Sequence, residues 1–260
     1  MLRGAARNPL IVELPFMGWV KTEPVVKLTV NINVHRGRYR NATLITGFHG
    51  IGETGYIATS FLVQALKAKR IGFIEVDHPP PFVNSTPEGI VTPFEIYRKN
   101  NLIIVKLEFS PHKSEEAEFA RALSSWVIRE RFKEAIMVGG LDSRFKTENS
   151  KLRVVSTRAF NSRARAFEGQ RLEEELFVYG PLAIMLSEFE IHDFPAIAIL
   201  PYASSVRPDP AAAAVAIRNI CKMCDLKVDV SELERDAEEI EAEIEKRMEQ
   251  TQKSFQGMFV

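Results

Sequence analysis

Three glycines have the spacing of a phosphate-binding loop: Gly50, Gly52 and Gly55. They repeat the G-x-G-x-x-G pattern of dinucleotide-binding folds. A buried strand pattern (42–48) precedes the loop and a helical pattern follows it, and a pyrophosphate binds backbone N–H groups at such a helix N-terminus. Glu75 and Asp77 follow roughly 20 residues later, where an acid would bind the ribose. One hypothesis is therefore an enzyme that binds a nucleotide or a phosphate.

Other features of the same loop disfavour a bound phosphate. Glu53 lies inside it, and its carboxylate would repel a phosphate at close range. The loop contains no lysine, so it is not a Walker A sequence. The alternative interpretation is structural, because glycines after a strand permit a positive φ and a tight turn into a closely packed helix. The residues alone leave both interpretations open.

The remaining reactive side chains form no recognised catalytic arrangement. The histidines lack the H-x-x-x-H spacing of a metal site, and the sequence contains no G-x-S-x-G motif. Asp142 and Ser143 follow a Gly-Gly pair and could face a pocket at a strand end, although such a pair is common in loops. Cys221 and Cys224 form a C-x-x-C late in an expected helix, whereas a redox pair lies at a strand-to-helix turn. We interpret these cysteines as core residues and expect no metal and no cofactor.

Strand and helix patterns alternate along residues 1–204. Residues 24–34 alternate apolar and polar side chains, as a half-exposed strand does. Further strands are expected at 42–48, 71–76, 90–91, 94–98, 101–109, 134–138, 152–156 and 194–202. Helices are expected at 55–69, 115–131 (with Ser114 as its N-cap) and 181–188. Buried strands between helices predict an α/β fold, a three-layer α/β/α sandwich with a parallel or mixed sheet.

The overall composition argues against several classes of protein. Lys and Arg together number 34, as do Asp and Glu, so the formal net charge is zero and gives no general attraction to nucleic acid or to an anionic membrane. Two cysteines make no disulfide framework. No apolar run approaches the roughly 20 residues that span a bilayer, and the N-terminal segment lacks the apolar region of a signal peptide. We expect a cytoplasmic protein without a nucleic-acid or membrane partner.

A basic stretch at 144–171 is a local exception to this balance. Its cations are Arg144, Lys146, Lys151, Arg153, Arg158, Arg163, Arg165 and Arg171. Acids interrupt the stretch and aromatic residues are few, so we favour a solvated or partner-facing surface over an RNA-binding one.

The sequence changes character after residue 204, where a helical extension is expected. An alanine-rich helix is expected at 211–224, and an acidic helix at 231–253 begins with a capping box, Ser231 and Glu234. Apolar residues recur along the second helix at near-heptad spacing. This seam consists of Leu233, Ala237, Ile240, Ile244 and Met248. A lone helix cannot bury such a seam, so it packs on its own domain or on another subunit, and we favour self-association.

The last residues of the chain are apolar. Met258, Phe259 and Val260 follow Gly257, an arrangement suited to capture by a partner, in which the carboxylate pairs with a lysine and the ring fills a pocket. Folding back on the protein's own surface is the alternative. We therefore expect a core domain at 1–204, a helical oligomerisation region at 205–254 and a flexible tail at 255–260.

Several motifs together resemble the archaeal members of the proteasome assembly chaperone 2-like family. They are GFHGIGETGYIATSFLVQAL, IMVGGL, YGPLAIMLSEFEIHDFPAIAILPYA and LKVDVSELERDAEEIEAEI. The resemblance implies an α/β/α core similar to the nucleoside phosphorylase and hydrolase-like folds. It also implies a non-enzymatic binding protein that forms homo-oligomers, with a tetrameric or pentameric ring as one possibility. In this family the glycine turn is kept without a dinucleotide.

The resemblance also gives the tail a role. Some relatives end in a hydrophobic–tyrosine–any residue tail that docks between proteasome α subunits, and Met258-Phe259-Val260 resembles that tail with Phe in place of Tyr. The sequence thus predicts a homo-oligomeric chaperone or adaptor of an archaeal-type proteasome system. A nucleotide- or phosphate-binding enzyme using Gly50, Gly52 and Gly55 is the alternative, and an RNA-associated protein acting through 153–171 is a third reading.

Overall fold

The computed structural model describes residues 28–35, 37–87, 89–146, 150–163 and 167–257. Within the last helix it describes side chains as far as Glu243, together with that of Lys246. No helix in these ranges has the length and apolar character needed to cross a membrane.

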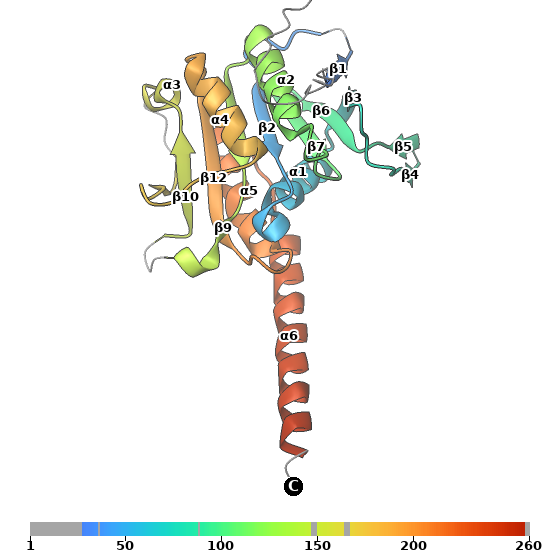
Figure 1. Cartoon of the computed structure of the whole chain (residues 1–260), viewed down its shortest axis with the longest axis vertical. Helices are drawn as coiled ribbons and strands as arrows, with labels where there is room; N and C mark the ends of the chain where they lie inside the picture. The colour runs from blue at the N-terminus through green and yellow to red at the C-terminus, as the bar shows by residue number, and fades with distance from the viewer. Residues whose placement is uncertain (1–27, 36, 88, 147–149, 164–166, 258–260) are drawn as a thin grey trace, which may run out of the picture.

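A ten-stranded mixed sheet forms the middle layer of the described structure (Figure 1). Its order is β1-β3-β6-β7-β2-β8-β12-β10-β11, and β9 pairs with the end of β12. The strands are β1 (Asn31–Val34), β2 (Thr43–Gly47), β3 (Lys69–Glu75), β6 (Phe94–Lys99), β7 (Leu102–Leu107), β8 (Glu134–Val138), β9 (Leu141–Asp142), β10 (Leu152–Ser156), β11 (Gln170–Arg171) and β12 (Ala196–Ala203). The central strands β7, β2, β8 and β12 run parallel, while β1, β3 and β6 pair antiparallel with their neighbours. At the other edge, β10 is antiparallel to β12 and parallel to β11.

Helices cover both faces of this sheet, because its central strands are apolar on both sides. On β2, Leu44 belongs to the core beneath α2 (Glu116–Arg129) and α4 (Pro181–Ile191). The next residue, Ile45, belongs to the core beneath α1 (Thr54–Ala65) and α5 (Pro210–Cys224). On β8, Met137 belongs to the first of these cores and Ile136 to the second. Successive side chains of these strands thus point to opposite faces of the sheet, and both faces are buried beneath helices. This arrangement confirms the predicted α/β/α sandwich.

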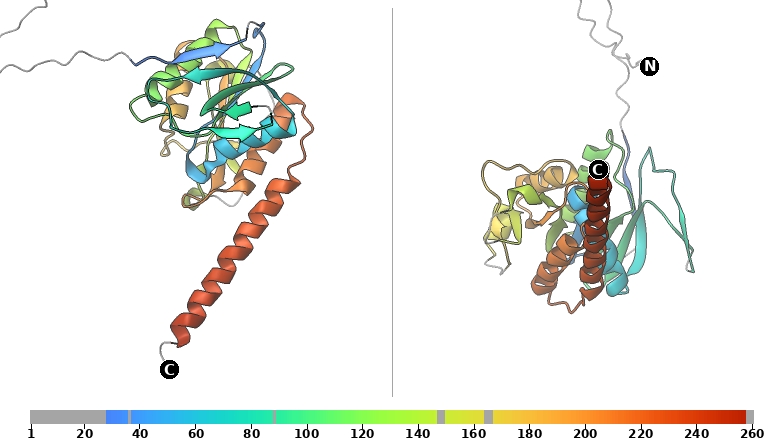
Figure 2. Two further views of the ribbon diagram at one scale, coloured as in Figure 1. Left: turned by 90° about the vertical axis from the view of Figure 1, so that its right-hand side faces the viewer. Right: turned by 90° about the horizontal axis from the view of Figure 1, so that it is seen from below.

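The last helix, α6 (Ser231–Gly257), leaves the body of the molecule (Figures 1 and 2). Its first turns pack on α5 through the buried side chains of Leu233 and Ala237. Glu234 also forms an ion pair with Arg218 of α5. The helix has 27 residues, so it is about 40 Å long, and most of it projects beyond the sheet.

Some local predictions were wrong in detail. Ser114 does not cap α2, because the helix begins after Glu115 and the Ser114 hydroxyl contacts His112 instead. The capping box at α6 does not form as predicted. The Asp229 carboxylate accepts the hydrogen bonds of the Ser231 backbone N–H and hydroxyl. Glu234 instead forms an ion pair with Arg218.

Shorter elements connect the main ones. The strand expected at 90–91 is the second arm of a two-stranded hairpin, β4 (Asn84–Thr86) with β5 (Gly89–Val91). Short helical turns occur at η1 (Ile51–Glu53), η2 (Ser143–Phe145) and α3 (Arg158–Asn161). Of these, η1 and η2 lie at the carboxyl ends of central strands, where they help to build the site described next.

Candidate functional site

The glycine loop lies at the carboxyl edge of the sheet, beside the loop that follows β8. The strands β2 and β8 are neighbours in the sheet. The strand that follows β2 in the chain, β3, lies toward one edge of the sheet, whereas β10 and β12, which follow β8, lie toward the other edge. Adjacent parallel strands whose connections diverge in this way leave a crevice outside their carboxyl ends, which is where α/β proteins bind ligands. The fold therefore makes this edge the first place to look for a site.

Close packing explains two of the three motif glycines. Gly52 has φ +64°, and a Cβ there would lie 2.7 Å from the Cβ of Ala203. A Cβ on Gly55 would lie 2.7 Å from backbone atoms of both Phe48 and Val138. Real Cβ atoms do not approach that closely, so only glycine fits at these positions. The packing thus supports the structural interpretation of the motif.

The two neighbouring loops also touch through backbone. A Cβ on Gly140 would lie 2.2 Å from the carbonyl oxygen of Ile51. The glycine loop also contacts the residue before α5, because the Gly52 carbonyl accepts a hydrogen bond from the Asp209 N–H. Gly50 differs from the others, since a Cβ there would meet no atom within 4 Å. Gly50 faces the space between the loops rather than a packed neighbour.

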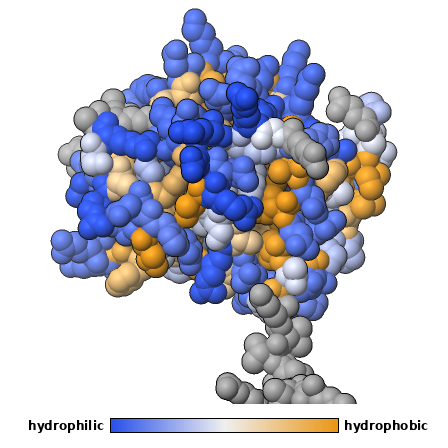
Figure 3. Space-filling view, turned by 90° about the horizontal axis from the view of Figure 1, so that it is seen from above, coloured by the Kyte–Doolittle hydropathy of each residue, from blue (hydrophilic) through white to orange (hydrophobic). Residues whose placement is uncertain are grey.

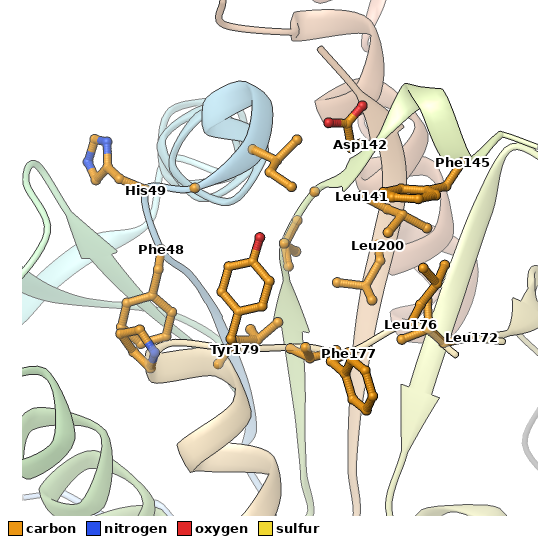
Figure 4. Close-up of a pocket in the computed structure, with 18 of the residues that line it drawn as sticks. Phe48, His49, Leu141, Asp142, Phe145, Leu172, Leu176, Phe177, Tyr179 and Leu200 are labelled. Atoms are coloured by element: carbon orange, nitrogen blue, oxygen red, sulfur yellow. The ribbon is translucent and has the colours of Figure 1, made fainter. Parts of the chain in front are cut away.

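That space is a cavity of about 480 Å³ whose walls are mainly apolar (Figure 4). The ends of β2 and β8 form its floor with Phe48, Val138 and Leu200 of β12. The segment before α4 forms the opposite wall, with Leu172, Leu176, Phe177, Val178 and Tyr179. Tyr179 extends across the opening toward the glycine loop, while His49 points away from the cavity (Figure 4).

Large aromatic side chains around this cavity are exposed to solvent. The exposed fraction is 79% for Phe177 and 77% for Tyr179, and Phe145 is about half exposed. A cluster of this kind on a surface commonly marks an interaction site. The face at the other end of the molecule from α6 is different, because hydrophilic side chains predominate there and the apolar ones fall into small separate groups (Figure 3).

A buried arginine holds the wall of the cavity in place. Arg153 of β10 is only 3% exposed; its Nε donates to Glu173 at 2.7 Å and its Nη1 donates to Gln170 at 2.8 Å. The guanidinium also lies over the ring of Tyr202. Arg153 was interpreted from the sequence as part of a solvated basic stretch, and that was wrong for this residue, since it anchors the segment that leads to Leu176 and Phe177.

An ionised pair, Asp142 with Arg144, lies at the cavity rim. The Oδ2 atom of Asp142 accepts from Arg144 Nε at 3.0 Å and from Arg144 Nη2 at 2.6 Å, and Oδ1 accepts from the Arg144 backbone N–H. These hydrogen bonds, first those of the guanidinium, lower the pKa of Asp142 from 3.8 to about 2. The suggestion that Asp142 faces a pocket at a strand end agrees with its place in the lining.

We expect the carboxyl resonance of Asp142 in an NMR titration to have its midpoint near pH 2, and Arg144→Gln to move it up toward 3.8. A carboxyl pKa that is lower in the folded state than in the unfolded state stabilises the fold above the unfolded value. That contribution is lost as the pH falls through about 2. An unchanged midpoint in Arg144→Gln would show that the guanidinium does not set the pKa.

A second polar group lies at the glycine loop, where His49 borders the cavity with its ring turned away from it. The His49 ring stacks on Tyr56 with centroids 4.5 Å apart, and its Nε2 lies 3.1 Å from the Leu107 carbonyl oxygen. The Tyr56 hydroxyl donates to Glu108; burial first, and then the Glu108 charge, raises the pKa of Tyr56. These contacts tie the loop to the end of β7. In the described ranges, no cluster of three or more His, Cys, Asp or Glu side chains is arranged to hold a metal ion.

The other predicted sites lie in the helical extension. Cys221 and Cys224 are on α5 and pack against the core, and burial raises the pKa of Cys221. The seam divides. Leu233 and Ala237 are buried on the protein's own body and Ile240 is half-buried. The side chains of Ile244 and Met248, and the whole of Met258, Phe259 and Val260, lie outside the described residues.

A model of the PAC2 family matches residues 44–248, which covers the sheet from β2 onward, its helices and most of α6. The chain belongs to the PAC2 family. Among curated proteins, it is 27% identical over 229 residues to an uncharacterised protein of Methanocaldococcus jannaschii, covering 82% of this chain and 87% of that protein. A second uncharacterised protein of the same organism is 25% identical over 229 residues, covering 79% and 83%.

Solved structures of similar fold include two proteins of Pyrococcus furiosus. PbaA, an archaeal homolog of proteasome-assembly chaperone, has a TM-score of 0.76 and 24% identity, covering 88% of this chain and 95% of PbaA. PbaB, an archaeal proteasome activator, has a TM-score of 0.70 and 20% identity, covering 85% and 98%. This PAC2 family chain therefore shares its fold with both proteins over nearly their whole lengths.

The cavity wall is the part of the site that sequence reasoning missed. Residues 172–180 were left between two predicted elements. The signal was present, because LFVYG is an apolar run within an otherwise polar stretch. Its position opposite the glycine loop depends on the ion pair of buried Arg153 with Glu173, a contact between residues 20 positions apart.

Proposed function

We propose that this protein is a non-enzymatic, homo-oligomeric chaperone or adaptor of an archaeal-type proteasome system, acting in the cytoplasm. The observation that carries the proposal is membership of the PAC2 family over residues 44–248, together with a fold shared with PbaA and PbaB. The packing of Gly52 and Gly55 supports it, because these glycines have a structural reason that requires no nucleotide.

In this proposal the C-terminal residues make the contact with the proteasome. Gly257 ends α6, so Met258, Phe259 and Val260 begin about 40 Å from the first turn of that helix. A long helix that projects from the body (Figure 2) suits a tail that must reach a partner. We propose that Phe259 fills a pocket between proteasome α subunits while the terminal carboxylate pairs with a lysine.

Self-association is assigned to α6. Leu233 and Ala237 attach the helix to its own body, and the seam beyond them, from Ile240 to Met248, supplies apolar residues at the same spacing. A helix with an apolar stripe and no neighbour is unstable in water, so we propose that the helices of several subunits pack together. Several tails would then be displayed at one end of the assembly.

The proposal is tested by mixing the full-length protein with recombinant archaeal proteasome α subunits, and in parallel with intact core particles. Size-exclusion chromatography with native mass spectrometry then reports any complex. We expect co-elution with the intact core particles. If the protein elutes alone in both mixtures at micromolar concentration, the proteasome partner is wrong.

The residue at position 259 provides a graded prediction. The tail that this C-terminus resembles, found in some relatives, has Tyr where this chain has Phe259. If the docking pocket offers a partner for the hydroxyl, Phe259→Tyr adds one hydrogen bond, with a net gain of about 1 kcal/mol. We therefore expect roughly fivefold tighter binding to the core particle, measured by surface plasmon resonance. Weaker binding of Phe259→Tyr would mean that the pocket at this position is purely apolar.

A further inference from the structure

The cavity at the carboxyl edge of the sheet has the properties of a protein-binding site that is separate from the tail. It has a volume of about 480 Å³ and mainly apolar walls, and two of its aromatic side chains, Phe177 and Tyr179, are more than three-quarters exposed. Its walls are held in place by the glycine contacts on one side and by the hydrogen bonds of the buried Arg153 on the other. Exposed aromatic anchors around a depression are typical of hot spots in protein interfaces.

The charges of the lining indicate what kind of segment would fit. Among the residues that line the cavity, the carboxylates are Asp142 and Glu175 and the cation is Arg144. Asp142 and Arg144 neutralise each other through two side-chain hydrogen bonds. Glu175 is exposed and forms no ion pair within the described part of the chain. The net charge left on the lining is therefore negative.

The exposed rings also favour a positively charged partner. Phe177 and Tyr179 are exposed and line the same cavity as Glu175, and aromatic faces attract lysine and arginine side chains. A lysine or arginine can thus contact both the Glu175 carboxylate and a neighbouring ring. An acidic segment would meet only repulsion at the same position.

We propose that this cavity binds a partner protein through an exposed segment in which a large apolar side chain is flanked by lysine or arginine. The apolar side chain enters between the glycine loop and the wall formed by Leu172 and Leu176, and the basic neighbours lie over Glu175 and Phe177. The site does not involve the C-terminal tail, so it can be tested whether or not the tail binds a proteasome.

The probe is a fluorescein-labelled peptide, Gly-Lys-Lys-Phe-Leu-Lys-Lys-Gly, titrated with the full-length protein and followed by fluorescence anisotropy. Two matched peptides serve as controls. In one the lysines are replaced by glutamates, and in the other Phe-Leu is replaced by Ser-Ser. We expect the basic apolar peptide to bind at least about tenfold more tightly than either control. No binding of the basic apolar peptide at millimolar concentration, or equal binding of all three, would overturn the proposal.

Variants then locate the binding. Glu175→Lys is expected to weaken binding of the basic peptide about tenfold and to improve binding of the acidic one, and Phe177→Ser is expected to weaken binding of the basic peptide. Both side chains are exposed, so neither change should disturb the fold. Ile191→Ser is the matched control, because Ile191 is similarly exposed, at 73%, but lies at the far end of α4. If Glu175→Lys and Phe177→Ser bind like Ile191→Ser, the peptide is not in this cavity.

Discussion

Gly55→Ala is expected to destabilise the protein by roughly 3 kcal/mol or more. The added methyl group would lie 2.7 Å from the backbone nitrogen and carbonyl oxygen of Phe48 and from the carbonyl oxygen of Val138. These are backbone atoms of adjacent loops and strands, so they cannot move aside as a side chain would. Alanine favours a helix over glycine by only about 1 kcal/mol, which is too little to offset the clash.

Gly50→Ala is the matched control within the same motif. Gly50 has φ −166°, an extended backbone that any residue adopts, and a Cβ there would meet no atom within 4 Å. We expect its free energy of unfolding to stay within about 0.5 kcal/mol of the parent. Urea denaturation of the parent and both variants makes the comparison. A Gly55→Ala variant as stable as Gly50→Ala would show that close packing does not explain the motif.

The second large effect is expected from the outer part of the α6 seam. Replacing Ile240, Ile244 and Met248 together by serine should convert the assembly into monomers of 29.4 kDa. Each of these side chains contributes about 2 kcal/mol when it is buried, and each 1.4 kcal/mol is a factor of about ten in the dissociation constant. Sedimentation velocity across a range of concentrations measures the change.

The control for the seam lies on the opposite face of the same helix. Arg235, Glu239 and Lys246 are exposed, and their replacement by serine changes three residues with little loss of apolar surface. We expect this variant to keep the oligomeric state of the parent. If both variants dissociate equally, the effect comes from helix propensity rather than from the seam. If the parent protein is itself monomeric, self-association is refuted.

The layered core was predictable because its signals are local. Residues 42–48 and 134–138 are mainly apolar without alternation, which is typical of strands buried on both faces, and both were found as β2 and β8. The hairpin of β6 and β7 followed from the turn at Lys99-Asn100.

The start of α6 was harder to predict, because Ser231 had two acids within reach. Asp229, not Glu234, is the one that it contacts.

The candidate site was only half predictable. The glycine loop and Asp142 were identified as lying at strand ends, and the structure brings both to one cavity. The opposite wall could not be placed from the sequence, because its position depends on Arg153, a cation that a single sequence cannot distinguish from its exposed neighbours. Burial of a paired arginine is decided by the whole fold, since the charge is tolerated there only with Glu173 and Gln170 as partners.

The glycine motif shows why spacing alone is a weak guide to function. Its G-x-G-x-x-G pattern serves a phosphate in one fold, yet here Gly52 is packed against Ala203 and Gly55 against the backbone of Phe48 and Val138. A thermal-shift assay with NAD and with ATP separates the two readings directly. A bound ligand at 100 times its dissociation constant would stabilise the protein by about 2.7 kcal/mol, whereas the chaperone reading predicts no shift.

The most direct test of the central claim is the binding of the full-length protein to an archaeal proteasome core particle, measured beside a variant that lacks Met258, Phe259 and Val260. Surface plasmon resonance with the core particle immobilised gives both dissociation constants under the same conditions. The account predicts that the full-length protein binds and that the truncated one, with an unchanged oligomeric state, does not. Equal binding of the two proteins, or no binding by either, would contradict it.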